Sequence, residues 1–228
     1  GFMKQWRIRP RAERVSWPRD DCWIASWPRN VFTYCGPDMS SAEQNRNHAL
    51  LERIRKLLTP LTPEPTGVSP IFRSLPGIRI VLFDVYGTLL VSESGDIGTR
   101  ANQGDGKAAL AALHGAGIDV VNSEAGIQAE TALRKSLLQE HEALRKEGLD
   151  HPEVDILKMW AAVLNELTAR KMIGGAIDEE RTRLLAVEYE CRTNPAWPMP
   201  GLADMLSSIR DKKIEMGIVS NSQFYTPL

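Results

Sequence analysis

The sequence predicts an α/β fold with a parallel-sheet core and a helical domain inserted after the first strand. Two short runs of apolar, mostly β-branched residues lie at 78–83 and 214–219. Runs of this kind are typical of strands that a parallel sheet buries on both faces. The segment 101–197 between them has mostly helical periodicity. A strand, a helical insertion, a helix and a second strand in this order indicate an α/β core.

Composition restricts the class of protein. With 228 residues and a hydrophobic fraction of 43%, the chain can bury a globular core. Its net charge of −1 gives no electrostatic reason to expect nucleic acid or an anionic membrane as partner. No stretch approaches the ~20 apolar residues of a membrane span. Cys22, Cys35 and Cys191 are too few and too scattered for a disulfide framework. We therefore expect a cytoplasmic protein.

Residues 1–38 differ in composition from the rest of the chain, with a high density of tryptophan, arginine and proline. Two interpretations stay open. Either the repeated SWPR at 16–19 and 26–29 forms a Trp/Arg binding patch, or the natural chain starts at Met39 and the preceding segment is not native. In both cases the segment lacks a helical or strand period, and we expect an irregular conformation.

Residues 39–77 are expected to hold one helix and a linker. Ser40 or Ser41 can cap a helix over 40–58, where leucine and isoleucine recur at intervals of three and four residues. The segment 59–70 that follows is rich in proline. Because proline removes backbone donors and fixes φ, this segment is predicted to be an extended linker.

Five further helices are expected after the first strand, over residues 106–114, 123–147, 150–171, 178–191 and 201–212. Asp150 and Asp178 are the expected N-caps of two of them, because an aspartate side chain accepts hydrogen bonds from free amides at a helix start. The last helix leads directly into the second predicted strand. The others fall within the segment 101–197 and are predicted to form the inserted domain.

An acidic residue, Asp84, directly follows the first predicted strand, within the sequence FDVYGTLL at 83–90. Open α/β sheets bind their ligands at this carboxyl edge. Gly87 allows a tight turn beside the acid, and the Thr88 hydroxyl can orient the carboxylate or bind a substrate. A carboxylate held in this place can attack an electrophilic carbon or phosphorus and form a covalent ester.

The second predicted strand ends in Ser220 and Asn221. Because neighbouring parallel strands bring their carboxyl ends together, we expect Ser220 to lie beside Asp84. A hydroxyl and an amide at that edge can hold a departing anion or a phosphoryl oxygen.

FDVYGTLL at 83–90 and PMPGLADMLSSIRDKKIEMGIVSNS at 198–222 resemble the first and second motifs of the haloacid dehalogenase superfamily. The resemblance covers residues 78–228. It implies a Rossmann-like core built from 78–100 and 198–228, with a helical cap over 101–197. It further implies that Asp84 is the nucleophile, that Thr88 orients it, and that Ser220 and Asn221 bind substrate oxygen or halide.

The residue at position 86 distinguishes two groups of enzymes within the superfamily. Phosphatases of the superfamily usually have a second Asp at this position, two residues after the nucleophile, and it serves as general acid and base. The Asp-x-Tyr-Gly-Thr form is similar to the 2-haloacid dehalogenases, in which halide leaves without a proton. In those enzymes an arginine of the cap meets the substrate carboxylate, and a guanidinium binds a carboxylate in bidentate fashion. Tyr86 and Arg134 are therefore assigned to substrate binding, with Arg100 and Arg145 as alternatives to Arg134.

The two groups differ in substrate and cofactor. A dehalogenase would take a 2-haloacid and need no cofactor. A phosphatase-like enzyme would take a phosphate ester and bind Mg²⁺ through Asp84 and the backbone carbonyl of Tyr86.

The superfamily also has a lysine motif and an acidic-pair motif after the Ser-Asn motif, and the chain ends at Leu228 before either. We therefore expect an incomplete core and an inactive chain whose parent is a hydrolase. An incomplete core would leave an open sheet edge, which favours self-association. A third interpretation is a non-catalytic interaction protein.

Overall fold

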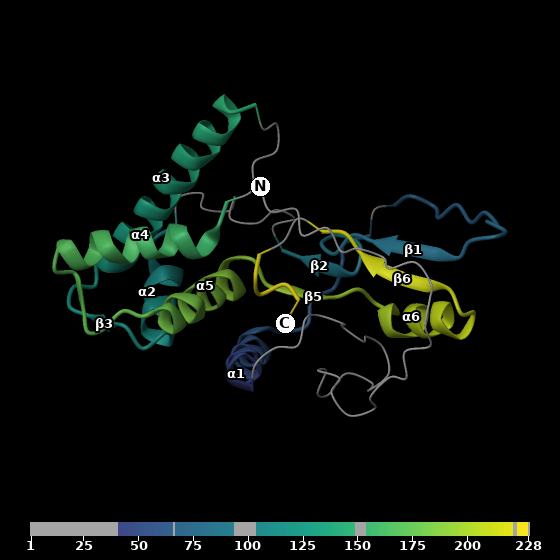
Figure 1. The fold of residues 1–228 in the computed structure, drawn as a ribbon, viewed down its shortest axis with the longest axis horizontal. Coiled ribbons are helices and arrows are strands. Elements are labelled where there is room, and N and C mark those ends of the chain that lie inside the picture. Colours follow the sequence, from purple (N-terminus) through teal and green to yellow (C-terminus); the bar gives the residue numbers. More distant parts are fainter. Residues whose placement is uncertain (1–40, 66, 94–103, 149–153, 221–222, 228) are drawn as a thin grey trace.

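The computed structural model describes residues 41–65, 67–93, 104–148, 154–220 and 223–227. Within these ranges the protein is a mixed α/β structure with six helices and three two-stranded sheets. Figure 1 shows most of the helices gathered at one end of the molecule and a parallel strand pair with one helix at the other. The α/β class is therefore confirmed, although the sheets are small. Residues 1–38, Arg100 and Asn221 lie outside the described ranges.

Five helices form the helical group: α1 (Ser41–Leu57), α2 (Lys107–Gly115), α3 (Ala125–Lys146), α4 (Ile156–Ala169) and α5 (Glu179–Thr193). Helix α5 packs against α1, α2 and α4, and α3 packs against α2 and α4. The Trp160 ring is fully buried and meets Tyr189 edge to face, with the ring centroids 5.0 Å apart. The short strands β3 (Asp119–Val120) and β4 (Ile173–Gly174) pair antiparallel at the margin of this group.

The capping predictions have different outcomes for α5 and α4. Asp178 caps α5 and accepts a hydrogen bond from the Arg181 amide at 2.8 Å, which confirms the prediction. Asp150, the other predicted N-cap, lies outside the described residues, and within them α4 begins at Ile156 with Asp155 as its N-cap. Two aspartates five residues apart have the same capping propensity, so the sequence could not distinguish them.

A buried ion pair joins α1 to α5. The Glu188 carboxylate is fully buried and pairs with Arg53 of α1 and with Arg192 of its own helix, the latter at 2.8 Å. Leu50 and Ile54 of α1 pack into the same apolar core. A buried carboxylate is costly unless it is paired, and two guanidinium groups meet that requirement. Helix α1 is therefore part of the packed helical group.

No helix or strand forms between α1 and the first strand in the described ranges 58–65 and 67–79. This agrees with the linker predicted from the prolines. None of the helices in the described ranges is long and apolar enough to cross a membrane.

The strands β1 (Ile80–Phe83) and β6 (Glu215–Ile218) pair in parallel, with Phe83 opposite Ile218. Both predicted strands are therefore confirmed, with slightly shorter bounds. Helix α6 (Leu202–Asp211) packs beside β6 and supplies Leu202 and Leu206 to a small core that also includes Leu89. The carboxyl ends of β1 and β6 point toward the helical group (Figure 1).

The expectation that these strands are buried on both faces is wrong. The exposed fractions of Ile80, Leu82 and Val219 are 41%, 57% and 62%. Among the described residues β6 is the one strand that pairs with β1, so the second edge of β1 has no strand on it. An apolar run indicates that a strand is able to pack on both faces. Whether it does so depends on the strands and helices that lie against it.

A third strand pair closes the helical insertion. Strands β2 (Leu90–Ser92) and β5 (Ala196–Pro198) are antiparallel, and the Glu93 amide donates to the Pro195 carbonyl oxygen at 3.1 Å. The two ends of the helical insertion therefore lie next to each other, where the chain leaves the strand region and where it returns. This pair could not be predicted from the sequence, because strands of three residues are too short to show an alternating pattern.

Candidate active site at the ends of two parallel strands

Asp84 and Ser220 lie at the same edge of the β1–β6 sheet. Asp84 directly follows Phe83, and the Val219 amide donates to the Phe83 carbonyl oxygen at 2.9 Å. The parallel register then places Asp84 opposite Val219, one residue before Ser220. The backbone therefore brings together the two chain positions that the sequence predicted to meet.

The segment after Asp84 folds into a compact turn. The Val85 carbonyl oxygen accepts hydrogen bonds from the amides of residues 88–90, with N–O distances of 3.2, 2.8 and 2.9 Å. Gly87 has a φ of 79°, a left-handed conformation that glycine adopts without steric cost. The Val85 side chain is buried, whereas Asp84 and Thr88 are exposed. The turn is held by its backbone and leaves both polar side chains accessible.

The Asp84 carboxylate has no hydrogen bond or ion pair with any of the described residues. Thr88, expected to orient it, likewise makes no hydrogen bond to Asp84 within that part of the chain. A carboxylate that is exposed and unpaired keeps its lone pairs available to an incoming electrophile.

The Ser220 hydroxyl differs from Asp84 because its oxygen is buried. It has no hydrogen-bond partner among the described residues. Buried polar atoms are nearly always hydrogen-bonded, so an unpartnered hydroxyl at a sheet edge requires an explanation. A substrate oxygen or a leaving anion beside Asp84 would supply the missing partner.

Tyr86 points its hydroxyl at the segment that follows β6. The Tyr86 hydroxyl and the Thr226 hydroxyl are hydrogen-bonded at 2.9 Å. Burial raises the pKa of Tyr86, which keeps the phenol protonated at neutral pH. In this structure Tyr86 therefore fastens the 223–227 turn, and its hydroxyl is already engaged.

Behind Tyr86 lies a buried polar cluster that sequence reasoning missed. Burial raises the pKa of Glu190, while a hydrogen bond that the Asn194 side-chain amide donates to its carboxylate, at 2.9 Å, opposes that rise. Burial also raises the pKa of the Cys191 thiol to about 12, so it remains a thiol and not a thiolate. Glutamate and cysteine side by side on a charged helix give no sequence signal that both are half-buried.

Arg134 is held within the helical group. It lies in α3, and its Nε is buried without a partner among the described residues. Burial and the nearby Glu130 raise the pKa of Tyr189, while Arg134 lowers it, so these three groups are neighbours. Figure 1 shows α3 apart from the ends of β1 and β6. The structure therefore does not bring Arg134 to Asp84, and the alternative Arg145 lies in the last turn of the same helix.

The donor atoms at this edge do not form a metal site within the protein. The described ranges contain no group of three or more His, Cys, Asp or Glu side chains that could hold an ion. Mg²⁺ is usually bound by one or two carboxylates together with substrate phosphates and water. Asp84 would supply one carboxylate, so most ligands of a bound Mg²⁺ would have to come from substrate and water.

Comparisons with family models, with curated proteins and with solved structures found no match to this chain.

Proposed function

We propose that the chain belongs to a haloacid dehalogenase-like hydrolase with a Rossmann-like core and a helical cap. Its reaction proceeds through an aspartyl ester on Asp84. The observation that supports this most is the placement of an exposed Asp84 carboxylate and a buried Ser220 hydroxyl at one sheet edge, neither with a hydrogen-bond partner among the described residues. We further propose a small-molecule substrate and a cytoplasmic location.

The proposed reaction has two steps. A carboxylate oxygen of Asp84 attacks the carbon that bears the halogen, a carbon–oxygen bond forms, and halide leaves with the bonding electron pair. Water then attacks the carboxyl carbon of Asp84, which regenerates the carboxylate and releases a hydroxy acid and a proton. Ser220 donates a hydrogen bond to the departing anion or to a substrate oxygen.

The state of Tyr86 favours a 2-haloacid over a phosphate ester as substrate. An alkoxide leaving group needs a proton, whereas halide does not. The Tyr86 hydroxyl is bonded to Thr226, and burial raises its pKa. It is therefore a poor general acid, and a reaction that needs none suits this site better.

A phosphatase-like hydrolase that uses Mg²⁺ is the second candidate, and the accessible Asp84 carboxylate favours it equally. The two candidates are separated by chloride release from 2-chloropropionate and by phosphate release from phosphate esters, each measured with EDTA and with added Mg²⁺. For the parent hydrolase that the resemblance implies, we expect chloride release that EDTA leaves intact. Phosphate release that depends on Mg²⁺, without chloride release, would reverse the order of the two candidates.

The covalent step is tested by mass spectrometry after a single turnover in H₂¹⁸O. In the same parent hydrolase we expect a transient adduct on the peptide that contains Asp84, and ¹⁸O in the Asp84 carboxylate afterwards. Asp84→Asn should show neither, because no nucleophile remains, whereas Asp204→Asn on α6 should behave as the parent chain. Label that enters the product directly would exclude the aspartyl ester. If no adduct or product forms under any of these conditions, a non-catalytic interaction protein is the better description.

A further inference from the structure

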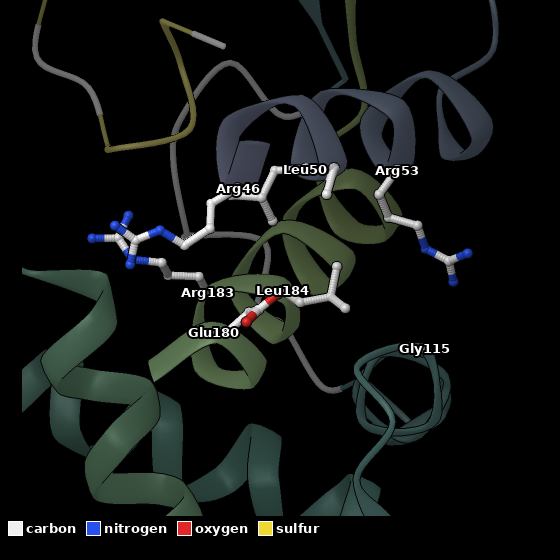
Figure 2. Close-up of a pocket in the computed structure, with 8 residues that line it drawn as sticks. Arg46, Leu50, Arg53, Gly115, Glu180, Arg183 and Leu184 are labelled. Atoms are coloured by element: carbon white, nitrogen blue, oxygen red, sulfur yellow. The ribbon is translucent and has the colours of Figure 1, made fainter. Parts of the chain in front are cut away.

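A cavity of about 200 Å³ lies between α1 and α5. Leu50 of α1 and Leu184 of α5 line its apolar part (Figure 2). Ligand pockets for drug-sized molecules have volumes of roughly 300–1,000 Å³. This cavity therefore suits a smaller molecule with a short apolar part.

Three arginines line the cavity, and they differ in their partners. Arg53 is paired with the buried Glu188. The Nε of Arg183 donates to Glu179 at 2.9 Å, and its guanidinium lies 5.0 Å from the centroid of the Phe224 ring. Arg46 is exposed and has no carboxylate partner among the described residues.

Figure 2 shows the guanidinium groups of Arg46 and Arg183 at the same end of the cavity, while Arg53 points away. Two like charges at one end repel each other, and an anion between them would remove that repulsion. Glu180 is the one carboxylate among the residues that line the cavity. It compensates part of the positive charge and would oppose an anionic ligand.

We propose that this cavity binds a small organic anion whose carboxylate or phosphate head contacts Arg46 and Arg183 and whose short hydrocarbon part lies on Leu50 and Leu184. Guanidinium groups match the planar oxygen pairs of both heads. The site is formed by α1 and α5 together with Gly115 at the end of α2, and it includes neither Asp84 nor Ser220. It is therefore independent of the proposed hydrolase function.

Isothermal titration calorimetry with the 228-residue chain tests the proposal. Hexanoate and hexyl phosphate are the probes, and their relative affinities identify the preferred head group. Hexanol and hexylammonium are the controls for the tail and for the sign of the charge. We expect saturable binding of at least one anion, weakened by added salt, and none of either control.

Four variants locate the binding. Arg46→Gln should weaken it by about tenfold or more, because it removes one charge-assisted contact. Glu180→Gln should strengthen it roughly threefold by removing the opposing charge. Arg210→Gln, on the exposed surface of α6, is the matched arginine control and should change nothing. Asp84→Asn should also leave binding intact, which separates this site from the proposed active site.

Arg46→Gln is the deciding variant, because Arg46 makes no contact that the described fold needs. Arg183→Gln should also weaken binding, with a thermal melt as the check on folding, since Arg183 stacks on Phe224. No binding of either anion overturns the proposal. The proposal is also overturned if Arg46→Gln leaves the affinity for the anion unchanged. It is overturned as well if hexanol binds as tightly as the anions.

Discussion

At the residue scale, Asp84 and Ser220 share one sheet edge but differ in burial. Asp84 is exposed, while the Ser220 oxygen is buried without a partner among the described residues. We predict that Ser220→Ala lowers the rate of adduct formation at Asp84 by about a hundredfold, as for a lost oxyanion donor. Because the hydroxyl has no partner to lose, the same change should leave the melting temperature unchanged or slightly higher. A large loss of thermal stability would show instead that Ser220 is a structural residue.

Glu190 links burial to pH. Its pKa is raised by burial, so the folded state binds a proton more tightly than the unfolded chain, where the ordinary value is 4.5. The stability that this group contributes is therefore fully present below about pH 4.5 and is lost as the pH rises through the raised pKa. We predict that Glu190→Gln removes this part of the pH dependence. Thermal melts between pH 4.5 and 8 should converge for the parent and the variant at low pH and separate as the pH rises.

The matched control for Glu190→Gln is Glu166→Gln, on the exposed face of α4, where Glu166 pairs with Arg170 at 3.4 Å. Its melting curves should follow those of the parent chain at every pH, because exposed ion pairs contribute little. Curves for Glu190→Gln and the parent chain that stay parallel across this pH range would contradict a raised pKa for Glu190.

At the scale of elements, the strongest link is the one between α1 and α5 through Glu188. The Glu188 carboxylate is fully buried between two arginines. We predict that Glu188→Gln destabilises the helical group by about 1–3 kcal/mol, because two partly exposed guanidinium groups lose their counter-ion and a buried side chain loses charge-assisted hydrogen bonds. Chemical denaturation followed by circular dichroism measures this change.

The control for Glu188→Gln is Glu142→Gln, which breaks an exposed ion pair with Lys146 at 3.0 Å within α3. An exposed pair at this spacing contributes about 0.3–0.5 kcal/mol, so the control should be close to the parent chain. Equal and small effects of both changes would show that α1 does not depend on the buried carboxylate.

Features that depend on residues close together in the chain could be predicted from the sequence, whereas features that depend on distant contacts could not. Helix α5 could be predicted because Asp178 caps it and acids fill its first turn. The meeting of Asp84 and Ser220 could be predicted because two apolar runs in one parallel sheet must end together. The burial of Glu190 and the place of Arg134 could not, because each depends on which helix packs against which. The β2–β5 pair also depends on a contact between segments far apart in the chain.

At the scale of the whole molecule, the apolar surface of β1 is expected to determine how the chain behaves in solution. Leu82 is 57% exposed, and among the described residues the outer edge of β1 has no strand on it. Open apolar edges favour pairing with other chains. We predict that the chain binds a hydrophobic dye and self-associates with increasing concentration in sedimentation experiments. Leu82→Lys should reduce both effects without lowering the melting temperature.

Leu138→Lys is the matched control, because Leu138 on α3 is 63% exposed and receives the same new charge. It should leave dye binding and self-association as they are in the parent chain. If the parent chain stays monomeric and binds no dye, the edge of β1 is not a site of self-association.

The hydrogen bond between Glu93 and Pro195 has a consequence for how such a protein can change over evolutionary time. Because the two ends of the helical insertion coincide, the segment between them can be replaced without moving the strands that precede and follow it. An exchanged insertion would present new side chains to Asp84 while its backbone turn stayed the same. An ion pair between Arg53 of α1 and Glu188 of α5 ties the present insertion to the segment before β1. Any foreign replacement would therefore have to bring its own counter-ion for that arginine.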